Sequence, residues 1–208
     1  SWVEFDVMLS ADDVPVLHHD ELLGRTDNGS GPVAAQSAAQ LKALDAGAWF
    51  GPGFAGERIP TFEETISCCR ALGLSMNVEI KPTTGREVRT AEVSAYLNRL
   101  CPDLTDRIIV SSFVPDCLRI AQEKAPEFLR GYLSDTMAED WHEIAKDLGC
   151  FSIHPNHACL DAASIAAIQE SGFRVLTYTV NDPARAANLI DWGVDAVITD
   201  ELLADALT

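Results

Sequence analysis

Two carboxylates lie two residues apart in an apolar segment near the start of the chain, residues 2–9. Because successive side chains of a β-strand point to opposite faces, Glu4 and Asp6 share one face and the apolar residues beside them share the other. A second apolar segment repeats the pattern with Glu79 and Lys81. Oxygen ligands suit a hard divalent cation, which would also offset the repulsion between three carboxylates. We therefore expect Glu4, Asp6 and Glu79 to bind one divalent cation.

Each of these pairs also has a purely structural interpretation. Glu4 and Asp6 would form ion pairs with a nearby arginine or lysine, and Glu79 would form a salt bridge with Lys81 on an exposed strand. The third carboxylate in a matching strand favours the cation site over both alternatives.

Composition excludes several classes of protein. The chain has 208 residues, 47% of them apolar, which is enough for one domain with a sizeable core. A formal charge of −17 would repel a nucleic-acid backbone. No apolar run is long enough to span a membrane, and the N-terminal residues do not resemble a signal segment. Six scattered cysteines favour a reducing compartment, so we expect a cytoplasmic location, and the oligomeric state stays open.

The elements that would position these residues begin with a hairpin. Residues 10–13 are typical of a tight turn, after which the run 14–19 returns and brings His19 to about the level of Asp6. Residues 20–59 are irregular, with one short helical stretch at 38–44. We interpret residues 20–59 as an insertion over the mouth of the site, within a single domain of residues 1–208.

Strands and helices alternate over the rest of the chain. A helix that starts after Thr61 and ends at Gly73 is followed by βα units, including one helix over 88–100. Counting strands gives seven apart from the hairpin return, and no glycine-rich nucleotide loop follows any of them. Repeated βα units predict a parallel sheet, either closed as a barrel or open and doubly wound.

Several motifs occur together and in order along the whole chain. They are Glu4-x-Asp6, Val14-Pro15-Val16-x-x-His19-Asp20, Arg25-Thr26-x-Asn28-Gly29, Pro60-Thr61-x-Glu63-Glu64, Glu79-Ile80-Lys81-Pro82, Ser111-Ser112-Phe113, His154-x-Asn156-His157, Thr177-Tyr178-Thr179-Val180-Asn181 and Trp192-Gly193-Val194-Asp195-x-x-x-Thr199-Asp200. In this combination the chain resembles the glycerophosphodiester phosphodiesterases, and most closely their cytosolic bacterial members.

The resemblance implies an α/β fold, a (β/α)₈ TIM barrel that uses Mg²⁺ or Ca²⁺ to hydrolyse small glycerophosphodiesters to sn-glycerol 3-phosphate and an alcohol. By position, Glu4, Asp6 and Glu79 match metal ligands, Lys81 matches a phosphate-binding lysine, and His19 matches one of two catalytic histidines. The family's first strand and helix, with His-Arg-Gly and Glu-Asn-Thr, have no counterpart in the sequence. We therefore expect a further segment upstream of Ser1.

A histidine can protonate a leaving alkoxide at neutral pH, so His19 is the candidate general acid. A structural role for His19 is the alternative, and such a role is expected for His18. His154 and Tyr178 are candidates for substrate binding, against loop bracing for His154 and a core position for Tyr178. The sequence also leaves open a catalytically inactive barrel that binds a phosphoester or a partner protein.

Overall fold

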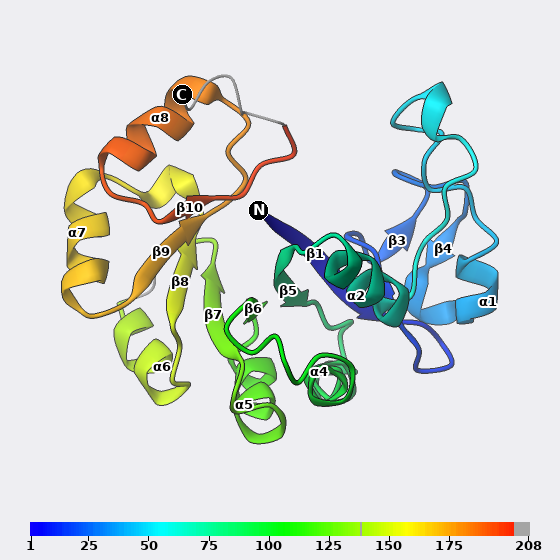
Figure 1. Ribbon diagram of the computed structural model, residues 1–208, viewed down its shortest axis with the longest axis horizontal. Coiled ribbons are helices and arrows are strands. Elements are labelled where there is room, and N and C mark those ends of the chain that lie inside the picture. The colour runs from blue at the N-terminus through cyan, green and yellow to red at the C-terminus, as the bar shows by residue number, and fades with distance from the viewer. Residues whose placement is uncertain (138, 202–208) are drawn as a thin grey trace.

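The computed structural model describes residues 1–137 and 139–201 and contains one strongly curved sheet (Figure 1). Its strands are β1 (Trp2–Leu9), β2 (Pro15–Leu17), β5 (Ser75–Ile80), β6 (Ile108–Ser112), β7 (Leu129–Ser134), β8 (Ser152–Pro155), β9 (Arg174–Thr177) and β10 (Ala196–Val197). The strand order is β10-β9-β8-β7-β6-β5-β1-β2. All neighbours are parallel except β2, which pairs antiparallel with β1. The seven parallel strands and the hairpin are confirmed.

Helices cover the outer face of the sheet, as Figure 1 shows. They are α2 (Phe62–Ala71), α3 (Glu87–Ala91), α4 (Ser94–Leu100), α5 (Pro115–Lys124), α6 (Trp141–Asp147), α7 (Ala162–Glu170) and α8 (Pro183–Asp191). Within the described residues β10 does not pair with β1 or β2, so the curved sheet forms part of a TIM-like barrel. The predicted α/β barrel class is confirmed.

Side-chain alternation along the strands separates an apolar layer from a polar interior. Val78 and Ile80 of β5 are buried in the apolar core that contains residues of α2, α4 and α5. Their neighbours Asn77 and Glu79 point to the other face, and Ser111 of β6 lies beside Glu79 in the register. The strands therefore place polar groups inside the barrel.

Helix α2 forms where the sequence predicted it, whereas the helical segment after β5 is divided into two helices. Helix α2 begins as expected after Thr61, whose side chain accepts a hydrogen bond from the backbone N–H of Glu64. The expected single helix over 88–100 is wrong, because the segment divides into α3 and α4. At this division the backbone N–H of Val93 donates a hydrogen bond to the carbonyl of Thr90, and the N–H of Tyr96 donates one to the carbonyl of Val93. Such bonds across three residues tighten the backbone and interrupt the α-helix.

The segment after the hairpin contains β3 (Leu22–Leu23), β4 (Gly31–Pro32), α1 (Ala38–Leu41) and the 3₁₀ turns η1 (Val33–Ala35) and η2 (Pro52–Phe54). It packs beside β1 and β2 at the right of Figure 1. Its apolar residues, among them Val33 and Leu41, form a small core with Met8 and Val16 of the hairpin. Helix α1 is shorter than the expected stretch 38–44. Among the described residues no helix has both the length and the apolar character needed to cross a membrane.

Candidate active site

The three predicted carboxylates come together at one end of the curved sheet. Asp6 of β1 lies directly beside Glu79 of β5 in the parallel register, and Glu4 precedes Asp6 by two residues on the same face. One ligand oxygen from each of the three lies within 4.8 Å of the others. Glu79 is buried and 7% exposed, whereas Glu4 keeps its access to solvent. The cluster therefore joins a buried carboxyl group to a solvent-accessible one.

The close approach of these groups changes their acid–base behaviour. Burial and the charge of Asp6 raise the pKa of Glu79 to about 8. Dense surrounding protein and the same charge raise the pKa of Glu4 to about 7, although part of its side chain is exposed. Carboxyl groups with raised pKa values keep their protons at neutral pH unless a positive charge compensates them.

The donor set fits a hard divalent cation. All three donors are oxygen atoms, which such ions prefer. Lys81 supplies one compensating charge, with its Nζ 3.2 Å from Oδ1 of Asp6. Asn77, beside Glu4 in the register, has no hydrogen-bond partner for its amide among the described residues. One ammonium group cannot balance three ionised carboxylates, so a cation that displaces the protons of Glu4 and Glu79 would supply the missing positive charge.

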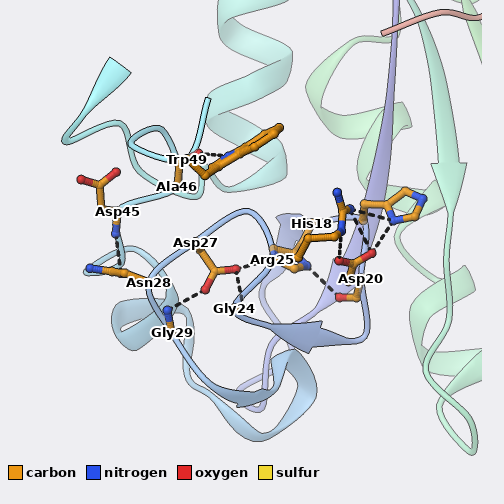
Figure 2. A network of polar contacts seen from close by, with 11 residues as sticks. His18, Asp20, Gly24, Arg25, Asp27, Asn28, Gly29, Asp45, Ala46 and Trp49 are labelled. Atoms are coloured by element: carbon orange, nitrogen blue, oxygen red, sulfur yellow. Dashed lines mark hydrogen bonds and ion pairs between the residues drawn. The ribbon is translucent and has the colours of Figure 1, made fainter. Parts of the chain in front are cut away.

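His19 lies at the rim of this mouth and is oriented by its neighbours. Its Nδ1 donates to Oδ1 of Asp20 at 2.7 Å, and its side chain is 63% exposed. Oδ2 of Asp20 lies 2.5 Å from Nε of Arg25, as Figure 2 shows for this pair. The guanidinium of Arg25 holds the pKa of Asp20 well below its usual range. A carboxylate with a strongly lowered pKa thus holds one ring nitrogen of His19, and the other ring nitrogen has no hydrogen-bond partner among the described residues.

His18 has the structural role that the sequence predicted. Its Nδ1 lies 2.7 Å from the carbonyl of Asp20, and its Nε2 lies 3.0 Å from Oδ2 of Asp27 (Figure 2). Both side chains are buried, at 5% and 0% exposure. The carboxylate of Asp27 also accepts hydrogen bonds from the backbone N–H groups of Gly24 and Gly29. This buried pair fixes the backbone that carries His19 and Asp20.

The two remaining candidates have different surroundings. His154 is fully buried, and its Nε2 lies 2.8 Å from the Ser152 hydroxyl. Burial lowers its pKa to about 3. Gly131 makes room for this ring, because a Cβ there would lie 2.5 Å from Nε2. Its substrate-binding role stays a prediction.

Tyr178 lies just after the carboxyl end of β9 and is less deeply buried than His154. Its hydroxyl donates to Oδ1 of Asp135 at 3.1 Å, and its ring packs edge-to-face on Phe113 at 5.6 Å. Burial and the neighbouring carboxylate of Asp135 raise the pKa of Tyr178, and the charge of Glu79 adds a smaller contribution. Tyr178 thus belongs to the wall near the carboxylates, which is compatible with the predicted contact to substrate.

Sequence analysis gave no site role to three residues that lie at the site. Asp20 and Arg25 appeared there only as motif positions, although the adjacent His19 and Asp20 were a visible signal. Asp200, which follows β10, lies close enough to raise the pKa of Glu4. A motif position without a structural context could not reveal that proximity.

The chain is similar in sequence and in structure to known phosphodiesterases. Residues 1–204 match the model of the glycerophosphoryl diester phosphodiesterase family. A glycerophosphodiester phosphodiesterase of Caldanaerobacter subterraneus is 32% identical over 204 residues, which cover 96% of this chain and 82% of that protein. A structure of an Oleispira antarctica phosphodiesterase in complex with its product sn-glycerol-3-phosphate superposes with a TM-score of 0.93 and 36% identity, covering 100% of this chain and 85% of that one. A glycerophosphodiester phosphodiesterase from Agrobacterium tumefaciens gives 0.78 and 26%, covering 100% and 87%. The chain therefore belongs to the glycerophosphoryl diester phosphodiesterase family, which confirms the resemblance and the enzyme class that the motifs predicted.

Proposed function

We propose that this protein hydrolyses glycerophosphodiesters to sn-glycerol 3-phosphate and an alcohol, with a divalent cation, Mg²⁺ or Ca²⁺, and with His19 as general acid. The observation that carries the proposal is the convergence of Glu4, Asp6 and Glu79 beside Lys81. Family membership supports the reaction, and the product in the Oleispira antarctica structure supports sn-glycerol 3-phosphate as the product here.

The carboxylates and the lysine have separate tasks at the phosphodiester. Glu4, Asp6 and Glu79 would hold the cation, which when bound supplies positive charge against the negative charge that develops at phosphorus. Lys81 lies beside Asp6 with a quarter of its side chain exposed, so its ammonium group can donate to a phosphate oxygen. Two kinds of positive charge would then orient the diester for attack.

His19 acts on the leaving group. Asp20 accepts a hydrogen bond from the Nδ1–H group. In the protonated ring Nε2 then carries the proton that the leaving alkoxide needs. Asp20 and Arg25 are positioning residues in this scheme, since neither needs to touch the substrate.

Steady-state hydrolysis of glycerophosphocholine tests the proposal. Activity should disappear with EDTA and return with Mg²⁺ or Ca²⁺. His19→Ala should lower kcat by about 100- to 10,000-fold, the usual contribution of a positioned general acid. His142→Ala is the matched control, because His142 packs on Trp141 and Phe173 in the α6 region. Binding of the diester without turnover, in the presence of either cation, would support the inactive-barrel alternative instead.

A further inference from the structure

Three buried side chains of the curved sheet carry polar atoms that have no hydrogen-bond partner among the described residues. They are the amide group of Asn77, the hydroxyl of Ser111 and Nδ1 of His154. Burying an unpaired polar group costs free energy, so each of these groups needs an explanation. Asn77 and Ser111 share a further property, because each lies directly beside a proposed cation ligand in the sheet. His154 does not, since β8 is separated from β6 by β7.

Ser111 of β6 has a proposed cation ligand on one side and a glycine on the other. Glu79 of β5 and Gly131 of β7 are its partners in the parallel register. The ring of His154 lies over Gly131, and its Nε2 is already bonded to the hydroxyl of Ser152. A serine hydroxyl turns about a single bond, so that of Ser111 can turn to an ionised Glu79 without a movement of the backbone.

The next residue, Ser112, has a structural role on the same strand. Like Ser111 it is 0% exposed. Its hydroxyl, however, donates to the carbonyl of Ile80 at 2.7 Å and accepts the backbone N–H of Val114 at 3.2 Å. Successive residues of a strand point to opposite faces of the sheet, so the two serines have different surroundings. Internal hydrogen bonding explains the burial of Ser112 but not that of Ser111.

Asn77 has the same relation to Glu4 that Ser111 has to Glu79. It lies beside Glu4 in the register of β1 and β5, and it precedes Glu79 by two residues on the same face. Its side chain is 4% exposed, and neither the amide nitrogen nor the amide oxygen has a partner among the described residues. The amide NH₂ group is a donor, and an ionised carboxylate is a strong acceptor.

We propose that Ser111 and Asn77 are positioning residues of the cation site, and that Ser111 donates a hydrogen bond to Glu79, and Asn77 to Glu4, when these carboxylates hold a divalent cation. Hydrogen bonds of this kind fix the orientation of ligating side chains. They also give the two buried polar groups their partners. This inference rests on the proposed function, because it assigns the groups that orient the ligands of its cation.

Calorimetric titration of Mg²⁺ or Ca²⁺ into the cation-free protein tests the role of Ser111. Ser111→Ala should weaken the cation affinity about ten- to one-hundred-fold, the usual effect of losing a hydrogen bond to a ligating side chain. In the same variant the unfolding free energy of the cation-free protein should stay equal or rise, because the hydroxyl that is removed is buried without a partner among the described residues. Ser111→Thr keeps a hydroxyl and should retain most of the affinity.

Ser112→Ala is the matched control. It removes the same group from the adjacent position, but this hydroxyl is bonded to the backbone. The unfolding free energy should therefore fall, and the cation affinity should change little. Asn77→Leu keeps the approximate size of the side chain and removes the amide, so it should behave like Ser111→Ala.

The two measurements together decide the inference. Unchanged cation affinity in Ser111→Ala and Asn77→Leu would overturn it. A loss of stability in the cation-free Ser111→Ala protein as large as that in Ser112→Ala would also overturn it, since the hydroxyl would then have a structural role. Failure of the unsubstituted protein to bind either cation would overturn the cation assignment of the proposed function, which is a different result from unchanged affinity in the variants.

Discussion

The carboxylate of Asp20 bridges His19 and Arg25, with Oδ1 2.7 Å from the imidazole Nδ1 and Oδ2 2.5 Å from the guanidinium Nε. Arg25 also donates from Nη2 to Oδ1 at 3.1 Å, so the contact is bidentate. A bidentate guanidinium fixes the plane of the carboxylate as well as its charge. The ring of His19, although largely exposed, therefore has a defined orientation.

Asp20→Asn should lower kcat for glycerophosphocholine about ten-fold. The amide keeps the size of the side chain but weakens the hydrogen bond that orients the ring, and hydrogen bonds to charged groups are worth roughly 1.5–3 kcal/mol before exposure weakens them. A p-nitrophenyl phosphodiester, whose leaving group needs no proton, should lose much less activity. Equal losses on both substrates would contradict a role exerted through His19.

Asp27→Ala should mainly affect stability. Asp27 is buried and accepts hydrogen bonds from Gly24 and Gly29, while it pairs with His18. Removing one partner of a buried pair commonly costs about 3–5 kcal/mol in unfolding free energy. Denaturant unfolding measures the loss, and Asp191→Ala on the exposed face of α8 is the control. An Asp27→Ala protein as stable as the control variant would show that the pair does not hold this segment.

Cation affinity should rise with pH between about 6 and 8.5. In the cation-free protein burial and the charge of Asp6 raise the pKa of Glu4 to about 7 and that of Glu79 to about 8. A cation must displace these protons, so binding releases protons and strengthens as the groups ionise. Calorimetric titration in buffers of different ionisation enthalpy counts the protons released. An affinity that is constant across this range would contradict the ligand assignment.

The same shifts predict how stability of the cation-free protein depends on pH. The folded pKa values of Glu4 and Glu79 lie above the ordinary glutamate value, so between about pH 4.5 and 8 the folded state binds more protons than the unfolded state. Their contribution is fully present below the unfolded pKa and is lost as pH rises through the folded pKa. Tm should therefore fall from pH 5.5 to pH 8.5. Glu79→Gln should flatten this fall, and a steeper fall in that variant would contradict the assignment.

The alternation of side chains along the strands was sufficient to predict that the three carboxylates converge. Glu4, Asp6 and Glu79 share one face because strand geometry leaves no other arrangement, and β1 and β5 are neighbours in the sheet. The hairpin was also predictable, since the N–H of His18 donates to the carbonyl of Asp6, close to the expected level of His19. Both features depend on regular backbone geometry.

Irregular segments limited the prediction. The pairing of Asp20 with Arg25 depends on a loop closed by two-residue strands, β3 and β4, which have no periodic pattern to detect. The division between α3 and α4 contains neither glycine nor proline at residues 92–93, so no residue marked it. The full burial of His154 follows from the glycine at position 131 on a neighbouring strand, and a contact between strands is not visible in a single sequence.

Lys81→Ala should weaken the binding of phosphate groups while it leaves cation binding intact. Lys81 is proposed to contact phosphate oxygen, so the affinity for inorganic phosphate, measured calorimetrically with saturating cation, should fall about ten- to one-hundred-fold, as expected for a lost charge-assisted hydrogen bond. The affinity for the cation should stay equal or rise, because the ammonium group that lies 3.2 Å from Asp6 repels a cation held by that carboxylate.

The control for this variant is Lys81→Arg, which keeps the positive charge and should retain most of the phosphate affinity. If Lys81 were instead a structural partner of Asp6, its removal would disturb the carboxylates themselves. Cation and phosphate affinity would then fall together in Lys81→Ala, and the free energy of unfolding would fall with them. Separate titrations of the two ligands, combined with denaturant unfolding, therefore distinguish a phosphate-binding lysine from one that only supports the cluster.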